Sequence, residues 1–247
     1  MSIIKKSAAF IIIGNEILSG KTKDLNLNFI AVELTKIGIN LHEARIVKDI
    51  EQDIINSINE LRVKYDYVFT SGGIGPTHDD ITALAVAKAF KVKLYRDEKA
   101  EKLLKQHYKK EQLNAARLKM ADIPEGASLL NNPVSAAPGF KIANLFVMAG
   151  VPAIMQSMFI AAKEYLVGGT IMQSKMVSAY ISEGNIAAKL TEIQNKYPEL
   201  EIGSYPHIKN ERLGTSLVVR GFVLADLNKA YEDILAMLAE LRAEIAE

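Results

Sequence analysis

Apolar and polar residues alternate in blocks along the first two-thirds of the chain, and each block has the length of one strand or one helix. The run Ala8–Ile13 is apolar throughout, which is typical of a parallel strand buried on both faces. The segment Ile81–Phe90 has apolar residues three and four positions apart, which predicts a helix. Alternation of this kind predicts an α/β fold in three layers, with helices on both faces of a mainly parallel sheet.

Capping residues and turn residues give the approximate limits of the other elements. Asp24 is placed to begin one helix, and either Asp49 or Asp53 to begin the next. Pro152 suits the first turn of a later helix. Prolines and glycines between 124 and 139 predict a long loop region. The further strands expected are 41–47, 65–69 and 140–148, and the further helices are 24–37, 49–63, 98–108 and 152–166.

Two adjacent glycines, Gly168 and Gly169, predict a boundary between a domain of residues 1–168 and a second of residues 169–247. Beyond them the pattern predicts the order strand, helix, strand, strand, helix, with helices at 183–196 and 225–246. That order is typical of a small α+β, ferredoxin-like domain.

The composition excludes several classes of function. The 247 residues contain no cysteine, which excludes disulfides, thiolate metal sites and cysteine nucleophiles. Thirty basic residues against twenty-nine acidic ones leave no net field to attract nucleic acid or an anionic membrane. No segment has the roughly 20 apolar residues of a membrane span. We therefore expect a cytoplasmic protein without nucleic-acid or membrane partners.

The segment between the third predicted strand and the helix 81–90 is rich in glycine and ends in two acids. Glycine lets the backbone approach a ligand closely, and the free N–H groups at a helix start attract anions. The two carboxylates, Asp79 and Asp80, would repel a phosphate unless a divalent cation lay between them. The candidate ligand-binding residues in this turn are Ser71, Gly72, Gly73, Gly75, Pro76, Thr77 and Asp79.

Ligands of open α/β sheets bind at the carboxyl ends of the strands. The residues that follow the predicted strands are therefore further ligand candidates. Taken singly, Glu16 and Asp24 are better explained by helix capping or by solvation than by ligand binding. The chain has no HExxH zinc spacing, no GxGxxG fingerprint and no P-loop lysine. The candidates at this rim are Glu16, Asp24, Asn26, Asp49 and Gly150.

The segment Gly72–Thr82 resembles the signature of the MoaB/Mog-type molybdopterin-binding domains. It is most similar to the N-terminal domain of the competence/damage-inducible protein CinA, and it is also similar to the N-terminal domain of eukaryotic FAD synthase. Other segments match these proteins in the expected order: 14–20, 24–26, 132–133, 137–140, 150–152 and 203–206.

This resemblance implies a small phosphorylated ligand, either a pterin or a nucleotide, and a homo-oligomeric assembly. It further implies hydrolysis of a pyrophosphate bond in ADP-ribose or an FAD-like dinucleotide, with a divalent metal such as magnesium. Asp80 and Asp49 are the catalytic candidates and also the candidate metal ligands. Lys119 and Arg117 could neutralise ligand charge, although both are equally explained as solvated helix residues. The alternative is a non-catalytic protein that binds molybdopterin or takes part in molybdenum cofactor biosynthesis.

The chain departs from the family pattern near the expected site. Ser135 and Ala136 stand where the CinA-like loop usually has glycine and threonine. Ala149 and Ile154 replace a common proline and a glutamate, and Met120 replaces a glutamine. The loss of a hydroxyl and a carboxylate at these positions leaves the ligand and the metal dependence open.

Overall fold

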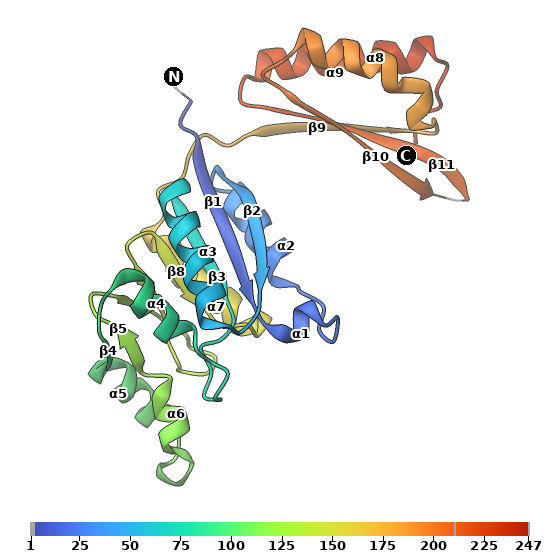
Figure 1. Cartoon of the computed structure of the whole chain (residues 1–247). Coiled ribbons are helices and arrows are strands. Elements are labelled where there is room, and N and C mark those ends of the chain that lie inside the picture. The colour runs from blue at the N-terminus through green and yellow to red at the C-terminus, as the bar shows by residue number, and fades with distance from the viewer. Residues whose placement is uncertain (1–2, 210, 247) are drawn as a thin grey trace. The chain divides into compact units, whose positions relative to one another are not determined.

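The computed structural model describes residues 3–209 and 211–246 (Figure 1). The chain divides into two compact units, of which the first is Ile4–Gly169 and the second begins at Thr170. Each unit has its own apolar core, so each is described by itself.

The first unit is built on one six-stranded sheet. Its strand order is β2-β1-β3-β8-β7-β6. The first four strands run parallel to one another. Strand β7 pairs antiparallel with β8 on one side and with β6 on the other. The mainly parallel sheet expected from the sequence is therefore confirmed. The strands, in chain order, are β1 (Lys6–Ile13), β2 (Ile39–Val47), β3 (Tyr67–Ser71), β6 (Ser128–Leu130), β7 (Gly139–Ile142) and β8 (Leu145–Met148).

Strand β1 shows why this sheet is covered on both faces. Ala9, Ile11 and Ile13 belong to the core that contains residues of α3 and α4. The alternate residues of β1 belong to a second core with residues of α2 and α7. Two helical layers thus enclose the sheet, as the wholly apolar strand predicts. The helices of these layers are α2 (Asn26–Thr35), α3 (Glu51–Lys64), α4 (Thr82–Phe90) and α7 (Pro152–Ala162), and a short α1 (Asn15–Leu18) follows β1.

A small insertion lies between α4 and β6. Its two short strands, β4 (Leu94–Arg96) and β5 (Asp122–Pro124), pair antiparallel. Between them lie α5 (Glu98–His107), the 3-10 turn η1 (Lys110–Gln112) and α6 (Ala115–Lys119). Helix α6 of this insertion ends at Lys119.

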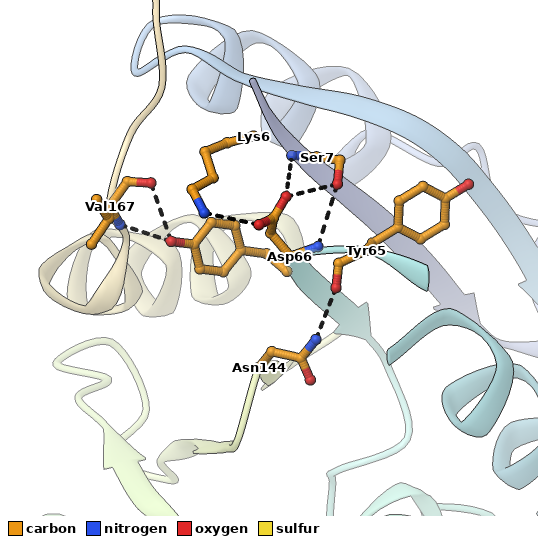
Figure 2. Close-up of polar contacts among 7 residues, drawn as sticks. Lys6, Ser7, Tyr65, Asp66, Asn144 and Val167 are labelled. Atoms are coloured by element: carbon orange, nitrogen blue, oxygen red, sulfur yellow. Dashed lines mark hydrogen bonds and ion pairs between the residues drawn. The ribbon is translucent and has the colours of Figure 1, made fainter. Parts of the chain in front are cut away.

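The expectation of one strand over residues 140–148 is wrong. This run forms an antiparallel hairpin of β7 and β8, which turns at Ala143 and Asn144. Ala143 has a φ of 50°, a left-handed conformation that alanine rarely adopts. The Asn144 side chain donates hydrogen bonds to the carbonyls of Arg62 and Tyr65, at 2.9 and 3.0 Å, and so anchors the turn. Figure 2 shows the bond to Tyr65.

Figure 2 also shows how the amino end of the sheet is held together. The Asp66 carboxylate accepts hydrogen bonds from the ammonium group of Lys6 and from the backbone N–H and hydroxyl of Ser7, each at 2.9 Å. Asp66 directly precedes β3, and the other two residues begin β1. These contacts join the neighbouring strands β1 and β3 at the end opposite to the one where parallel α/β sheets bind ligands.

The second unit has the order strand, helix, strand, strand, helix. Its sheet order is β10-β11-β9, with antiparallel neighbours, and Ile245 adds one antiparallel bridge to Ala179 of β9. The ferredoxin-like α+β expectation is confirmed. No helix in the described part of the chain is long and apolar enough to cross a membrane. The elements are β9 (Gln173–Ala179), α8 (Glu183–Lys196), β10 (Glu201–Lys209), β11 (Arg212–Gly221) and α9 (Leu224–Glu240).

Candidate functional site

A cavity of about 610 Å³ opens at the carboxyl ends of the parallel strands of the first unit. Residues from segments that lie far apart in the sequence line it, and they include most of the residues singled out in the sequence. The sequence-predicted residues that line this cavity are Glu16, Asp49, Gly72, Gly73, Gly75, Pro76, Asp79, Asp80 and Gly150.

The glycine turn between β3 and α4 is held by main-chain contacts. The Gly72 N–H donates to the Met148 carbonyl at 3.0 Å, and the Thr82 N–H donates to the Gly73 carbonyl at 2.9 Å. Gly72 and Gly73 have φ values of 106° and 69°, which disfavour any side chain. A Cβ on Gly73 would also lie 2.2 Å from the Thr82 hydroxyl oxygen. Glycine is therefore required at this position.

The same turn presents unused backbone donors. Within the described residues, no group accepts a hydrogen bond from the backbone N–H of Gly73, Ile74 or Gly75. Consecutive N–H groups in a turn with positive φ form a concave anion site. The turn therefore has the geometry of a phosphate cradle.

Two carboxylates border this cradle and are organised by Thr77. The Asp80 Oδ2 accepts a hydrogen bond from the Thr77 N–H at 2.8 Å. The Thr77 hydroxyl contacts Asp79 at 2.6 Å, and it also contacts Asp80. Its hydrogen bond lowers the pKa of Asp79 below its usual value, so Asp79 is ionised at neutral pH. Thr77 does not itself line the cavity, and its role is to orient the two acids.

Lys119, at the end of α6 in the insertion, hydrogen-bonds the glycine turn. Its ammonium group donates to the carbonyls of Thr77 and Asp80, at 2.9 and 2.8 Å. Arg117 is placed differently, because it lies over the Tyr108 ring at 4.7 Å and donates to the Gln112 carbonyl. Of the two cations proposed from the sequence, only Lys119 hydrogen-bonds the glycine turn.

Asp49 binds the beginning of α1 and does not cap α3. Its Oδ2 accepts a hydrogen bond from the Asn15 N–H at 2.9 Å. Helix α3 begins at Glu51 after Ile50, without a side-chain cap, so the expectation that Asp49 or Asp53 begins this helix is wrong. A residue from the end of β2 thus fixes the segment that carries Glu16.

A smaller cavity of about 50 Å³ adjoins this region, and Ser71, Asp24 and Asn26 line it together with Glu16 and Gly150. The Asp24 carboxylate accepts a hydrogen bond from the Leu27 N–H at 2.9 Å, although α2 begins at Asn26 after Leu25 and has no side-chain cap. The Asn26 side-chain amide donates to the Gly150 carbonyl at 2.8 Å.

The acidic residues fit a metal ion only in part. No group of three or more histidine, aspartate or glutamate side chains in residues 3–209 and 211–246 could hold a metal alone. Asp49 and Asp80 each use Oδ2 in the hydrogen bonds described above. Magnesium usually keeps several waters and binds through one or two carboxylates together with substrate phosphates. These residues therefore suit a metal that arrives with a phosphorylated ligand.

The sequence reasoning missed Tyr108, which lines the large cavity. It follows α5 in the insertion, so a search of residues that follow strands could not find it. Arg117 covers one face of its ring.

The comparisons with known proteins agree with this architecture. Residues 9–167 match the family model described as probable molybdopterin binding domain. Residues 171–245 match the FAD synthase middle domain. The chain belongs to the family of molybdopterin-binding domains of the MoaB/Mog type. The sequence motifs indicated the CinA-like form of this family, whereas the match of the second unit to an FAD synthase middle domain was not predicted from them.

Two curated relatives and one solved structure illustrate the likeness. A probable FAD synthase of Caenorhabditis elegans is 30% identical over 265 residues, which cover 97% of this chain and 50% of that protein. A CinA-like protein of Fusobacterium nucleatum is 35% identical over 184 residues, 74% of this chain and 42% of that protein. The chain thus spans half or less of these two relatives. The crystal structure of the protein CinA with unknown function from Thermoplasma acidophilum is 34% identical, with a TM-score of 0.62 over 65% of this chain and 98% of that one.

Proposed function

We propose that the first unit binds a phosphorylated nucleotide or pterin and hydrolyses a pyrophosphate bond, as in ADP-ribose or an FAD-like dinucleotide, with a divalent metal. One observation carries this proposal. Gly73, Ile74 and Gly75, whose backbone N–H groups have no acceptor among the described residues, line the same cavity as Asp49 and Asp80. A phosphate cradle bordered by carboxylates suits the chemistry of metal-assisted phosphoryl hydrolysis.

Each part of the site has a separate role in this proposal. The backbone of the glycine turn holds one phosphate, and Lys119 keeps the turn in place through two carbonyls. Asp80 orients the attacking water, and Asp49 is the second carboxylate available to the metal. A divalent metal, when bound, neutralises charge between the carboxylates and the phosphates and polarises the phosphoryl oxygens.

The relatives favour a nucleotide over a pterin. The probable FAD synthase of Caenorhabditis elegans aligns with 97% of this chain, and its name places it in dinucleotide metabolism. The second unit matches the FAD synthase middle domain, which a lone molybdopterin-binding domain does not include.

A second candidate is a non-catalytic protein that binds molybdopterin for cofactor biosynthesis. The description of the matched family as molybdopterin-binding supports it. The replacement of a common glutamate by Ile154, which lines the cavity, also supports it because one potential catalytic acid is lost.

The test is incubation of the purified full chain with ADP-ribose, FAD and free molybdopterin, each with Mg²⁺, Mn²⁺ or Co²⁺. Chromatographic analysis of the products should show release of AMP from the dinucleotides only when metal is present. The variant Asp80→Asn should lower turnover by about a hundredfold or more. It should keep its melting temperature, because Asn can still accept the hydrogen bond from Thr77.

A matched control is Asp97→Asn. Asp97 caps α5 by accepting a hydrogen bond from the Ala100 N–H at 2.8 Å, and it does not line the cavity. This variant should keep full turnover. Binding of molybdopterin without hydrolysis of any dinucleotide would replace the proposal with the second candidate.

A further inference from the structure

Only one of the two polar atoms of the Asn26 side-chain amide has a hydrogen-bond partner among the described residues. Asn26 is the first residue of α2 and is 3% exposed. Its nitrogen donates to the Gly150 carbonyl at 2.8 Å, and its oxygen Oδ1 has no hydrogen-bond partner among the described residues. A buried acceptor without a donor is costly, so this oxygen indicates a donor that the protein chain does not supply.

Asn26 lines the small cavity of about 50 Å³ rather than the large one. Glu16 and Gly150 line both cavities. Asn26 is bonded to Gly150 directly, so it lies at the junction of the two. A ligand with a phosphate on the glycine turn is therefore close enough to place another of its groups in the small cavity.

The charges of the small cavity decide what kind of group fits. Two carboxylates, Glu16 and Asp24, line it against one cation, Lys23. Together with the Asn26 oxygen they make a cavity rich in acceptors, which disfavours a second phosphate. A neutral donor such as a sugar hydroxyl is suited to it, since carboxylates commonly accept hydrogen bonds from ribose hydroxyls in nucleotide sites.

We propose that the cavity beside Asn26 takes a ribose hydroxyl of a nucleotide whose phosphates lie on the glycine turn. This inference rests on the proposed function and makes the ligand a ribonucleotide. It predicts that the protein binds a deoxyribonucleotide more weakly than the corresponding ribonucleotide, although the phosphates of both make the same contacts. Asn26 is then a specificity-determining residue.

The experiment measures the affinity of the full chain for ADP, 2′-deoxy-ADP, 3′-deoxy-ADP and inosine diphosphate by calorimetry with Mg²⁺. We expect ADP and inosine diphosphate to bind alike, and one of the deoxy compounds to bind about tenfold more weakly, the upper range for one hydrogen bond. In Asn26→Ala, ADP should fall to the affinity of that deoxy compound, whose own affinity should not change.

The matched control is Asn144→Ala. The Asn144 side-chain amide also donates hydrogen bonds to backbone carbonyls. However, Asn144 precedes β8, whereas the cavities lie beyond the carboxyl end of that strand. The Asn144→Ala variant should still bind ADP more tightly than the deoxy compound, including where it loses as much stability as Asn26→Ala.

The outcomes separate the inference from the proposed function. Equal binding of ADP and both deoxy compounds would overturn the ribose inference and leave nucleotide binding intact, with a bound water as the donor to Asn26. Weaker binding of inosine diphosphate alone would overturn it in favour of a base amine. Failure of every nucleotide to bind would overturn the proposed function together with the inference.

Discussion

The carboxylate of Asp49 accepts a hydrogen bond from the backbone N–H of Asn15, with 2.9 Å between Oδ2 and N. The first residue belongs to the segment after β2 and the second begins α1, so two neighbouring strand ends are joined at the cavity. Glu16, the next residue, also lines the cavity. One contact therefore positions two of the candidate acids.

This contact makes the structural and chemical roles of Asp49 separable. Asp49→Asn keeps an oxygen that can accept from Asn15 but loses the charge, so turnover should fall about a hundredfold with little change in melting temperature. Asp49→Ala loses the acceptor as well and should cost about 1 kcal/mol of stability, as other lost helix-start acceptors do. Thermal melts and dinucleotide hydrolysis measure the two effects. Wild-type turnover in a folded Asp49→Asn variant would remove Asp49 from the catalytic site.

Gly73 should tolerate no side chain. Gly73→Ala places a Cβ in a left-handed conformation, at about 1 kcal/mol, and against the Thr82 hydroxyl, at a further 1–3 kcal/mol or so. Gly126→Ala is the matched control, because its φ is 81° and nothing lies within 4 Å of the added Cβ. Chemical denaturation should show the larger loss for Gly73→Ala, and calorimetry should show loss of nucleotide binding for that variant alone. Equal losses of stability would mean that the turn can move away from Thr82.

Lys119 should affect the ligand site more than the fold. Lys119→Met removes both hydrogen bonds to the turn, so nucleotide affinity or turnover should fall about tenfold, equivalent to about 1.4 kcal/mol. Lys105→Met, which breaks the surface ion pair with Glu101, should leave both quantities unchanged. Unchanged binding and turnover in Lys119→Met would show that the turn holds its shape without these hydrogen bonds.

Glu43 should make stability depend on acid pH. Hydrogen bonds from Lys64, Tyr65 and Arg45 lower its pKa from 4.5 to about 2. A carboxyl group whose pKa is lower in the folded state stabilises the protein fully above the unfolded pKa, and this contribution disappears as the pH falls from about 4.5 to 2. Urea denaturation should therefore show a difference between wild type and Glu43→Gln at pH 6 that shrinks toward pH 2. A difference independent of pH would show that Glu43 acts through packing alone.

The fold was predictable where the sequence pattern itself determines the element. Every residue of Ala8–Ile13 is apolar and buried, and helix α8 spans Glu183–Lys196 as the pattern predicts. The β7–β8 hairpin was missed because its turn at Ala143 and Asn144 contains neither glycine nor proline. Contacts of Asn144 with residues some 80 positions away stabilise the turn, and no local pattern reveals them.

The candidate site was predictable where its residues follow strands of the sheet. The rule that ligands bind at strand ends selected Glu16, Asp49 and Gly150, which line one cavity. Lys119 and Tyr108 come from the insertion, whose docking beside the glycine turn depends on tertiary packing. The roles of all these residues in binding and catalysis stay predictions.

The turn at Gly72 and Gly73 has a consequence for how such proteins diverge. Main-chain contacts to Met148 and Thr82 hold it, and these contacts do not depend on which side chain stands at a rim position such as Ile154. The side chains of the rim can therefore change while the backbone of the turn stays the same. Proteins that share this backbone turn can therefore differ in the ligand that they bind.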